Sequence, residues 1–148
     1  MTDKSIKNEN IAKKINQTLE ELWVLLETKE RNYTNFQLNN QQYTLLTLII
    51  RYPSSTPTEL AEIMNITKSA ISQQLVKLEA ERYIIRKQHM NDKRTFSVEL
   101  GEKGLLYKKE CDIFMQQVSE KYYASLLPEE LSNLLSALLK LTKVIDKL

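Results

Sequence analysis

Apolar residues recur at helical spacing over much of the chain. Near the N-terminus, one such stripe consists of Ile11, Ile15, Leu19, Leu22 and Leu26. Intervals of three and four residues place these side chains on a single face of a helix. The stripe predicts a helix from residue 11 to about residue 29, and the Asn- and Thr-rich residues 32–40 predict a loop after it. Because the stripe is also typical of a coiled coil, we expect this helix to pack against another helix.

Two capping signals mark the starts of short helices in the middle of the chain. Asn39, with Gln42 three residues later, predicts a helix that begins near residue 39 and runs through residue 51. Thr56 is followed by a proline at the first helical position and by a glutamate at the third. This combination predicts a second helix over residues 57–64.

A further helix follows after a very short turn. Asn65 is a residue that adopts the left-handed conformation at a helix end, and Thr67 is a good cap for a helix from residue 68 to about residue 81. Two helices joined by so tight a turn, with the small Ala61 where they cross, predict a helix-turn-helix.

The helix predicted over residues 68–81 has two different faces. Its core stripe consists of Ile71, Leu75 and Leu78. At 100° per residue, the opposite face carries Ser69, Gln73 and Val76, with Ser72 and Lys77 beside them. A merely solvated helix more often carries Glu and Lys pairs. Short hydroxyl and amide side chains suit contacts to bases and phosphates in the major groove of DNA.

Two strands are predicted after this helix, over residues 83–88 and 95–100. In the second strand Phe96, Val98 and Leu100 alternate with polar residues, which is the period of a half-buried strand. The two strands predict a β-hairpin with residues 89–94 at its tip. A helix-turn-helix followed by a basic hairpin is the winged-helix arrangement, so the predicted fold class is mainly α with a two-stranded wing (α+β).

The rest of the chain is predicted to be helical. A helix from about residue 102 to residue 126 has the stripe Tyr107, Cys111, Phe114, Val118, Tyr122 and Leu126. After Pro128, a last helix carries a leucine-rich stripe to the end of the chain. These terminal helices offer more apolar surface than one chain can cover, so we infer that they pack between two chains. An ordinary bundle within one chain is the alternative.

The charge of the chain is concentrated in one segment. The formal net charge is only +2, but residues 66–94 hold seven Lys and Arg against three Asp and Glu, an excess of +4. A basic patch on one element is typical of a surface that binds nucleic acid. A lysine-rich face that is simply solvated is the alternative.

Composition argues against several other classes of protein. His89 is the sole histidine, and the chain has no glycine-rich phosphate-binding motif, so we expect no catalytic site, no metal site and no cofactor. One cysteine cannot form an internal disulfide, which is typical of a reducing compartment. The longest apolar run, Leu45–Ile50, contains Thr47 and is too short to span a bilayer, and no secretory signal is visible. We therefore expect a cytoplasmic protein with no membrane partner.

An ordered set of short motifs resembles the MarR family of transcriptional regulators over essentially the whole chain. The motifs are Glu59-Leu60-Ala61-Glu62, Ile66-Thr67-Lys68-Ser69-Ala70-Ile71-Ser72, Leu78-Glu79-Ala80, Asp92-Lys93-Arg94 and Leu100-Gly101-Glu102-Lys103-Gly104. Two positions depart from the family pattern. Arg82 stands where the family often has a glycine in a left-handed turn, and Gly101 stands where the family usually has a capping threonine.

The resemblance implies a homodimer that binds a palindromic operator in double-stranded DNA. Residues 37–100 would form the winged helix-turn-helix domain that binds DNA. Residues 1–36 and 101–148 would form the helical dimerisation region. The protein would be a sequence-specific regulator, a repressor that a small lipophilic or phenolic ligand or an oxidant releases from DNA. The alternative is a winged-helix module for protein–protein interaction that does not bind DNA specifically.

By matching position, the resemblance also implies roles for individual residues in DNA binding. Bases or phosphates would be contacted by Ser69, Ser72, Gln73 and Lys77, with Thr67 and Lys68 near the backbone and Val76 against a thymine methyl. From the wing, Arg94 would enter the minor groove, with Asp92 orienting it through an ion pair. Further phosphate contacts would come from Arg86, Lys87, His89 and Lys93.

The effector site is implied by the resemblance as well. Such regulators bind ligands in a crevice between the dimerisation helices and the winged helix, and the candidate lining residues are Trp23, Tyr33, Phe36, Tyr43 and Tyr107. Each of these aromatic residues has an ordinary place in the core as its alternative. Cys111 is a candidate redox-sensing thiol, with inert packing on the helix stripe as its alternative.

Overall fold

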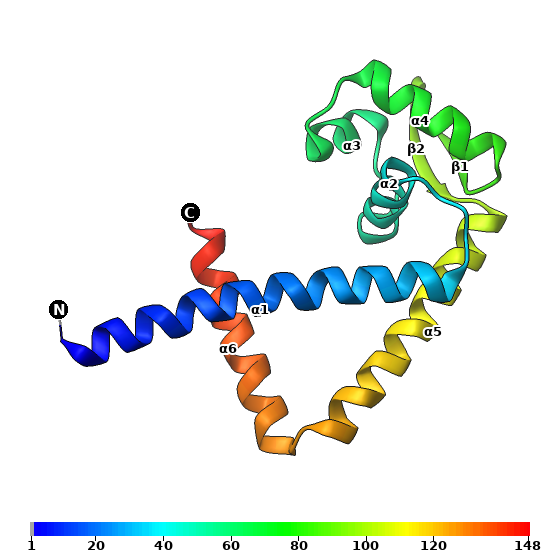
Figure 1. Cartoon of the computed structure of the whole chain (residues 1–148). Coiled ribbons are helices and arrows are strands. Elements are labelled where there is room, and N and C mark those ends of the chain that lie inside the picture. Colours follow the sequence, from blue (N-terminus) through cyan, green and yellow to red (C-terminus); the bar gives the residue numbers. More distant parts are fainter. Residues whose placement is uncertain (1) are drawn as a thin grey trace. The chain divides into compact units, whose positions relative to one another are not determined.

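The computed structural model describes residues 2–148, apart from the side chain of Lys93. Over that part of the chain the elements are α1 (Asp3–Thr34), α2 (Asn40–Arg51), α3 (Pro57–Met64), α4 (Lys68–Ala80), β1 (Ile84–His89), β2 (Asp92–Leu100), α5 (Glu102–Ser125) and α6 (Pro128–Asp146) (Figure 1). The mainly α fold with a two-stranded antiparallel wing is confirmed. The chain forms two compact units that meet between Cys111 and Asp112, within α5. The division into a DNA-binding and a dimerisation region stays a prediction.

Helix α1 is longer than the sequence pattern predicted. It begins at Asp3 and continues to Thr34, so residues 32–34, which were predicted to lie in a loop, are helical. Asn35 then ends the helix in the left-handed conformation, with φ of 52° and its N–H donated to the Arg31 carbonyl. The prediction was wrong at both ends because an apolar stripe marks only the part of a helix that has apolar residues. Polar residues extend the helix without a periodic signal.

The capping predictions for the short helices are confirmed. Asn39 and Gln42 form a reciprocal capping box at the start of α2, with N···O distances of 2.9 and 3.0 Å. Thr56 and Glu59 form a second box at α3. The Thr67 hydroxyl accepts a hydrogen bond from the Ala70 N–H at 3.1 Å and begins α4. These bonds satisfy backbone donors that a helix start otherwise leaves free.

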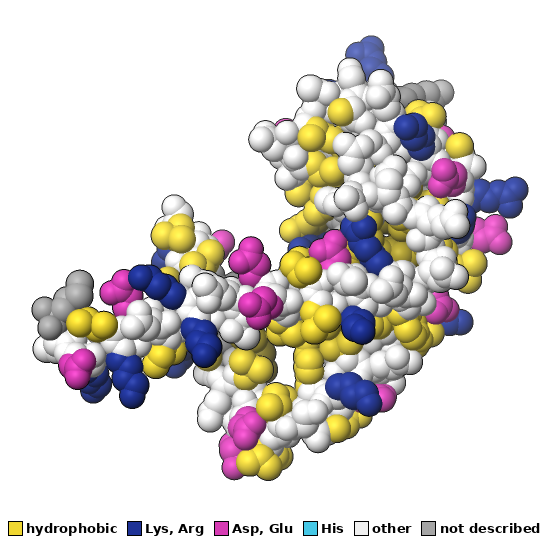
Figure 2. All heavy atoms as spheres, viewed as in Figure 1, with side chains coloured by type: hydrophobic (Ala, Val, Ile, Leu, Met, Phe, Trp, Pro, Cys, Tyr) yellow, Lys and Arg dark blue, Asp and Glu magenta, His cyan; other side chains and the backbone are white. Residues whose placement is uncertain are grey.

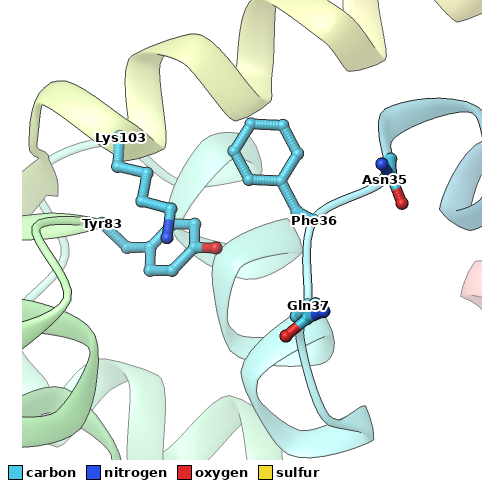
Figure 3. Close-up of a pocket in the computed structure, with 5 residues that line it drawn as sticks. All are labelled: Asn35, Phe36, Gln37, Tyr83 and Lys103. Atoms are coloured by element: carbon cyan, nitrogen blue, oxygen red, sulfur yellow. The ribbon is translucent and has the colours of Figure 1, made fainter.

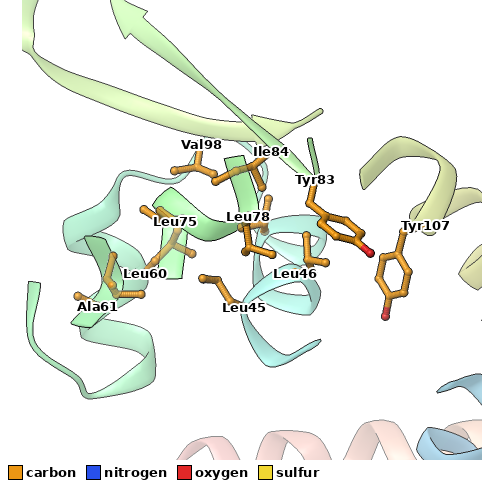
Figure 4. Packing of buried hydrophobic residues seen from close by; sticks show 12 residues of the cluster. Leu45, Leu46, Leu60, Ala61, Leu75, Leu78, Tyr83, Ile84, Val98 and Tyr107 are labelled. Carbon is orange, nitrogen blue, oxygen red and sulfur yellow. The ribbon is translucent and has the colours of Figure 1, made fainter. Parts of the chain in front are cut away.

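The core of the winged helix lies between α2, α3, α4 and the wing (Figure 4). Its buried members are Leu45, Leu46, Ile49, Leu60, Ala61, Ile71, Leu75, Leu78, Tyr83, Ile84, Val98 and Tyr107. The Val98 N–H donates to the Ser55 carbonyl at 2.8 Å, which joins β2 to the segment before α3. The three helices and the wing therefore form one packed body that fixes the orientation of α4.

The wing differs from its predicted form. Its strands extend to His89 and Asp92, so the turn is only residues 90–91 rather than the tip of residues 89–94. The register shifts after Gln88, which pairs with Phe96, whereas His89 pairs with Asp92. Residues 93–95 thus form a bulge in β2. Polar residues in a bulged strand show no alternation, which is why the pattern missed this part of the hairpin.

Helix α4 ends in a left-handed turn at Arg82. The φ angle of Arg82 is 65°, its N–H donates to the Glu79 carbonyl, and the Tyr83 N–H donates to the Leu78 carbonyl. This is the hydrogen-bond pattern of a Schellman motif. The turn that a glycine usually makes is therefore kept here by an arginine, at the steric cost of a Cβ in the left-handed region.

We expect Arg82→Gly to raise the free energy of unfolding by about 0.5 to 1 kcal/mol. Relief of the left-handed strain exceeds the added entropy of a glycine in the unfolded chain. Urea denaturation measures the change, and Arg82→Ala is the matched control because it removes the side chain and keeps the strain. An Arg82→Gly protein no more stable than Arg82→Ala would contradict the strained turn.

Two glycines let the start of α5 approach this turn closely. A Cβ on Gly101 would lie 2.7 Å from the Arg82 carbonyl oxygen, and a Cβ on Gly104 would lie 2.0 Å from that of Tyr83. The Gly101 N–H donates to the Tyr83 carbonyl, and the Lys103 N–H donates to the Arg82 carbonyl. Packing therefore favours glycine at position 101, where the family usually has a capping threonine, because a side chain there would meet the backbone.

Candidate nucleic-acid interface

The two faces predicted for α4 are both present. Ile71, Leu75 and Leu78 are buried in the core. The five residues of the opposite face are all exposed: Ser69, Ser72, Gln73, Val76 and Lys77. Thr67 and Lys68 are exposed at the start of the helix. Val76 is 54% exposed although it is apolar, so packing within this chain gives no reason for its position.

Helix α4 is held by polar contacts beside this exposed face. The Gln74 amide donates to the Gln41 Oε1, which joins α4 to α2. At the other end of the helix, Glu79 pairs with Arg86 of the wing at 3.1 Å. Gln73 and its neighbour Gln74 therefore have different surroundings, since one faces outward and the other is half-buried against α2.

The wing presents several of the expected basic residues. His89 and Arg94 are exposed near its turn, and Lys87 is exposed on β1 with its Nζ 3.9 Å from the Glu99 carboxylate. Lys93, which was also expected to contact phosphates, has a side chain outside the described part of the chain. The Asp92 carboxylate accepts a hydrogen bond from the Arg94 backbone N–H at 2.9 Å. Asp92 thus holds the bulge through the backbone, instead of the ion pair with the guanidinium that the resemblance implied.

Arg86 has a structural contact that the sequence did not reveal. Its Nε lies 3.1 Å from Glu79 Oε2, and its guanidinium lies 4.6 Å from the centre of the Phe96 ring. Arg86 therefore connects the wing to α4 and is already engaged. The sequence has no local signal for this pair, because the two residues lie on different elements.

The aromatic residues expected to line one ligand crevice lie in different surroundings. Trp23 is 63% exposed and Tyr33 is 39% exposed, both on α1. Tyr107 is buried in the core, where its ring meets Phe36 edge-on with 5.3 Å between centroids. Phe36 alone of the five expected residues borders the hollow described next.

A hollow of about 360 Å³ lies where the segment after α1 meets the start of α5 (Figure 3). Its lining residues are Asn35, Phe36, Gln37, Tyr83 and Lys103. Figure 3 shows the Lys103 amine against the Tyr83 ring, and its Nζ lies 4.7 Å from the ring centre. The hydrophobic pattern placed Tyr83 on a strand, and Lys103 entered only as part of a family motif, so neither residue was expected to line a pocket.

Tyr43 belongs to a polar cluster that joins the end of α1 to α2. Its hydroxyl donates to the Glu30 carboxylate at 2.9 Å, and the Arg31 guanidinium lies 3.9 Å from its ring centre. Arg31 also donates to the Asn40 Oδ1 at 2.7 Å. Burial and the neighbouring Glu30 raise the pKa of Tyr43 above its usual range, so it remains a neutral hydrogen-bond donor.

Cys111 packs half-buried against the core. Burial raises the pKa of the Tyr107 hydroxyl, and contact with the Cys111 thiol raises it further. Thiol reactivity depends on the thiolate and on access to solvent, and burial reduces both.

Among residues 2–148, no helix combines the length and apolar character needed to cross a membrane. Within the same residues, no group of three or more His, Cys, Asp or Glu side chains is placed to hold a metal ion.

The arrangement of α2, α3, α4 and the hairpin defines a winged helix-turn-helix protein. Residues 38–96 match the model of the MarR family.

Curated relatives share part of this sequence, and solved structures share its fold. An uncharacterized HTH-type transcriptional regulator of Bacillus cereus is 40% identical over 70 residues, which are 47% of this chain and 48% of the relative. The matched segment thus spans about half the length of that relative. Streptococcus pneumoniae FabT, solved in complex with DNA, is similar in fold with a TM-score of 0.74 and 21% identity over 92% of this chain and 98% of that one. A MarR family protein from Bacillus stearothermophilus has the same TM-score with 18% identity, covering 93% and 97%.

Proposed function

We propose that this protein is a transcriptional regulator that binds a specific sequence in double-stranded DNA. The observation that carries the proposal is the exposed face of α4, formed by Ser69, Ser72, Gln73, Val76 and Lys77. This face is uncharged at its centre, stands opposite a fully buried stripe and lies on the same packed body as a basic wing. That combination suits a helix that enters the major groove while a hairpin contacts the adjacent backbone.

The proposed contacts are of two kinds: contacts to phosphates, which position the protein on DNA, and contacts to bases, which recognise the sequence. Thr67 and Lys68 at the start of α4, with Lys87 and His89 on the wing, hold phosphates and supply affinity that depends on salt. Residues of the exposed face of α4 read base edges. Arg94 enters the minor groove, where a narrow A·T segment attracts a guanidinium. Arg86 acts indirectly, because its side chain already joins the wing to α4.

We propose further that the regulator is a homodimer. Figure 2 shows apolar side chains on the surface along α1, and the exposed ones include Ile11, Ile15, Leu19, Leu22, Trp23, Val24 and Leu25. Helix α6 has no buried residue in this single chain, and its exposed apolar side chains include Leu134, Leu135, Leu138, Leu139, Leu141, Val144 and Ile145. A second copy of the chain would cover such surfaces, and two-fold symmetry would then match a palindromic operator.

The regulatory part of the proposal is that a small lipophilic or phenolic ligand, or an oxidant, releases a repressor from DNA. The hollow beside Phe36, Tyr83 and Lys103 offers two aromatic rings and one amine to such a ligand. An oxidant would act on Cys111. Because this thiol is half-buried, and burial limits access to it, we favour release by a ligand over release by an oxidant.

The proposal is tested by placing a negative charge in the centre of the exposed face of α4. The probe is a duplex enriched from a random-sequence pool by the unmodified protein, and its affinity is measured by fluorescence anisotropy. We expect Ser69→Glu to weaken binding by at least about a hundredfold, because a carboxylate in the groove repels phosphates and leaves base groups unpaired. Thr44→Glu makes the same charge change at an exposed position of α2 and is the matched control.

Two outcomes would contradict the proposal. One is the failure of the unmodified protein to enrich any duplex, which would favour the alternative of a protein–protein interaction module. The other is an equal effect of Ser69→Glu and Thr44→Glu, which would mean that the exposed face of α4 is not special. Light scattering tests the dimer separately, since a mass equal to one chain would exclude it.

A further inference from the structure

The reading face of α4 has a chemical composition that bears on which bases it contacts. Its centre offers one amide, Gln73, one branched apolar side chain, Val76, and the two hydroxyls of Ser69 and Ser72. It has no arginine. In the major groove, an arginine or a lysine is the usual bidentate donor to guanine, whereas Gln pairs with adenine and an apolar group contacts the thymine methyl.

We propose that Gln73 and Val76 make this protein specific for adjacent A·T pairs in each half of its operator. This inference rests on the proposed function and adds to it the base that each residue reads. Gln73 binds the N6 and N7 edge of an adenine with its amide, and Val76 packs against the methyl group of a thymine. The serine hydroxyls both donate and accept, so they add affinity without choosing a base.

The spacing of the two residues fits neighbouring base pairs. Gln73 and Val76 are three residues apart on one exposed face, so they are separated by about 4.5 Å along the helix axis at 1.5 Å per residue. Successive base pairs are separated by about 3.4 Å. The two side chains can therefore contact the same base pair or two neighbouring base pairs.

The cations near this face are placed for phosphates. Lys68 is the first residue of α4 and Lys77 lies in its last turn, so they bracket the uncharged centre. Arg86 is the arginine of the wing strand β1. Its guanidinium pairs with Glu79 and lies over the Phe96 ring, and these contacts keep it from reading bases in the major groove. A guanine-reading donor is thus missing from the centre of the face.

Adjacent glutamines provide a matched test of this assignment. Gln73 is exposed, whereas Gln74 is half-buried and hydrogen-bonded to Gln41. The proposal assigns base reading to Gln73 alone. Replacing either glutamine removes the same amide from the same helix, but only Gln73→Ala removes an amide from the exposed face, whereas Gln74→Ala removes the contact with Gln41.

The experiment compares selections from a random-sequence duplex pool by the unmodified protein and by Gln73→Ala, Gln74→Ala and Gln73→Arg. We expect the unmodified protein to enrich an inverted repeat with neighbouring adenine and thymine in each half. At the adenine position its preference over guanine is expected to be about tenfold or more. Gln73→Ala loses that preference, Gln74→Ala keeps it, and Gln73→Arg changes the preferred base from adenine to guanine.

Other outcomes overturn the inference and separate it from the proposed function. Two results overturn the base assignment and leave DNA binding intact. One is a repeat with guanine at the position that responds to Gln73, and the other is an equal loss of base preference in Gln73→Ala and Gln74→Ala. A guanine preference that disappears in Lys77→Met would assign reading to the lysine instead. Enrichment of no sequence at all, by a protein that folds, overturns the proposed function itself.

Discussion

Replacing Arg94 with alanine is expected to weaken binding to the enriched duplex by about ten- to hundredfold. The side chain is exposed on the bulge of β2, and the Asp92 carboxylate holds the backbone from which it projects. A guanidinium in a narrow minor groove is attracted by the enhanced negative potential there. In a dimer both wings lose this contact, so the loss counts twice. Each tenfold change in affinity corresponds to about 1.4 kcal/mol.

The Arg94→Ala measurement needs two controls. Arg51→Ala removes the same charge from an exposed position at the end of α2, and we expect it to change affinity much less. Light scattering and circular dichroism should show an unchanged mass and fold in both variants, since neither side chain belongs to the core. Unchanged affinity in Arg94→Ala would show that the wing does not contact DNA.

Gly104→Ala is expected to destabilise the protein by about 1 to 3 kcal/mol or more. In most helices an alanine is better than a glycine by about 0.5 to 1 kcal/mol, so helix propensity alone predicts a gain. Here the added Cβ would lie 2.0 Å from the Tyr83 carbonyl oxygen and 3.1 Å from the Leu100 Cδ2. Relief requires a shift of α5 away from the turn after α4, which disturbs the buried Tyr83. Overpacking of this kind typically costs about 1 to 3 kcal/mol or more.

Urea denaturation of Gly104→Ala measures this loss. Lys109→Ala is a suitable control, because it introduces an alanine at an exposed position of the same helix and meets no backbone. We expect that control to stay within about 0.5 kcal/mol of the unmodified protein. Stability equal to or above that of the unmodified protein in Gly104→Ala would contradict the close approach of α5 to the turn.

Local signals explain why much of the fold could be predicted from the sequence. A cap depends on residues three positions apart, so Asn39 with Gln42 and Thr56 with Glu59 located two helix starts correctly. The face of α4 follows from its 3.6-residue period, and the burial of Ile71 opposite the exposed Gln73 confirms it. These features require only neighbours along the chain.

Features that depend on distant residues were not predictable in the same way. The pair of Arg86 with Glu79 and the approach of Gly104 to Tyr83 both join different elements. The hollow beside Lys103 also depends on three separate segments. The hydrogen bond from the Arg94 backbone N–H to the Asp92 carboxylate was not expected either, because it depends on the bulge in β2. The ligand crevice expected around the aromatic residues stays a prediction, since a single chain's pattern does not say which rings meet.

The central claim is that α4 and the wing form a surface for duplex DNA, and its most direct test is the salt dependence of affinity. The unmodified protein is titrated with the enriched duplex at several concentrations of potassium chloride. Each phosphate contact contributes about −0.9 to the slope of log K against log salt concentration. Two copies with several cations each should give a slope steeper than about −4. A slope near zero, or no binding at low salt by a folded protein, would contradict the claim.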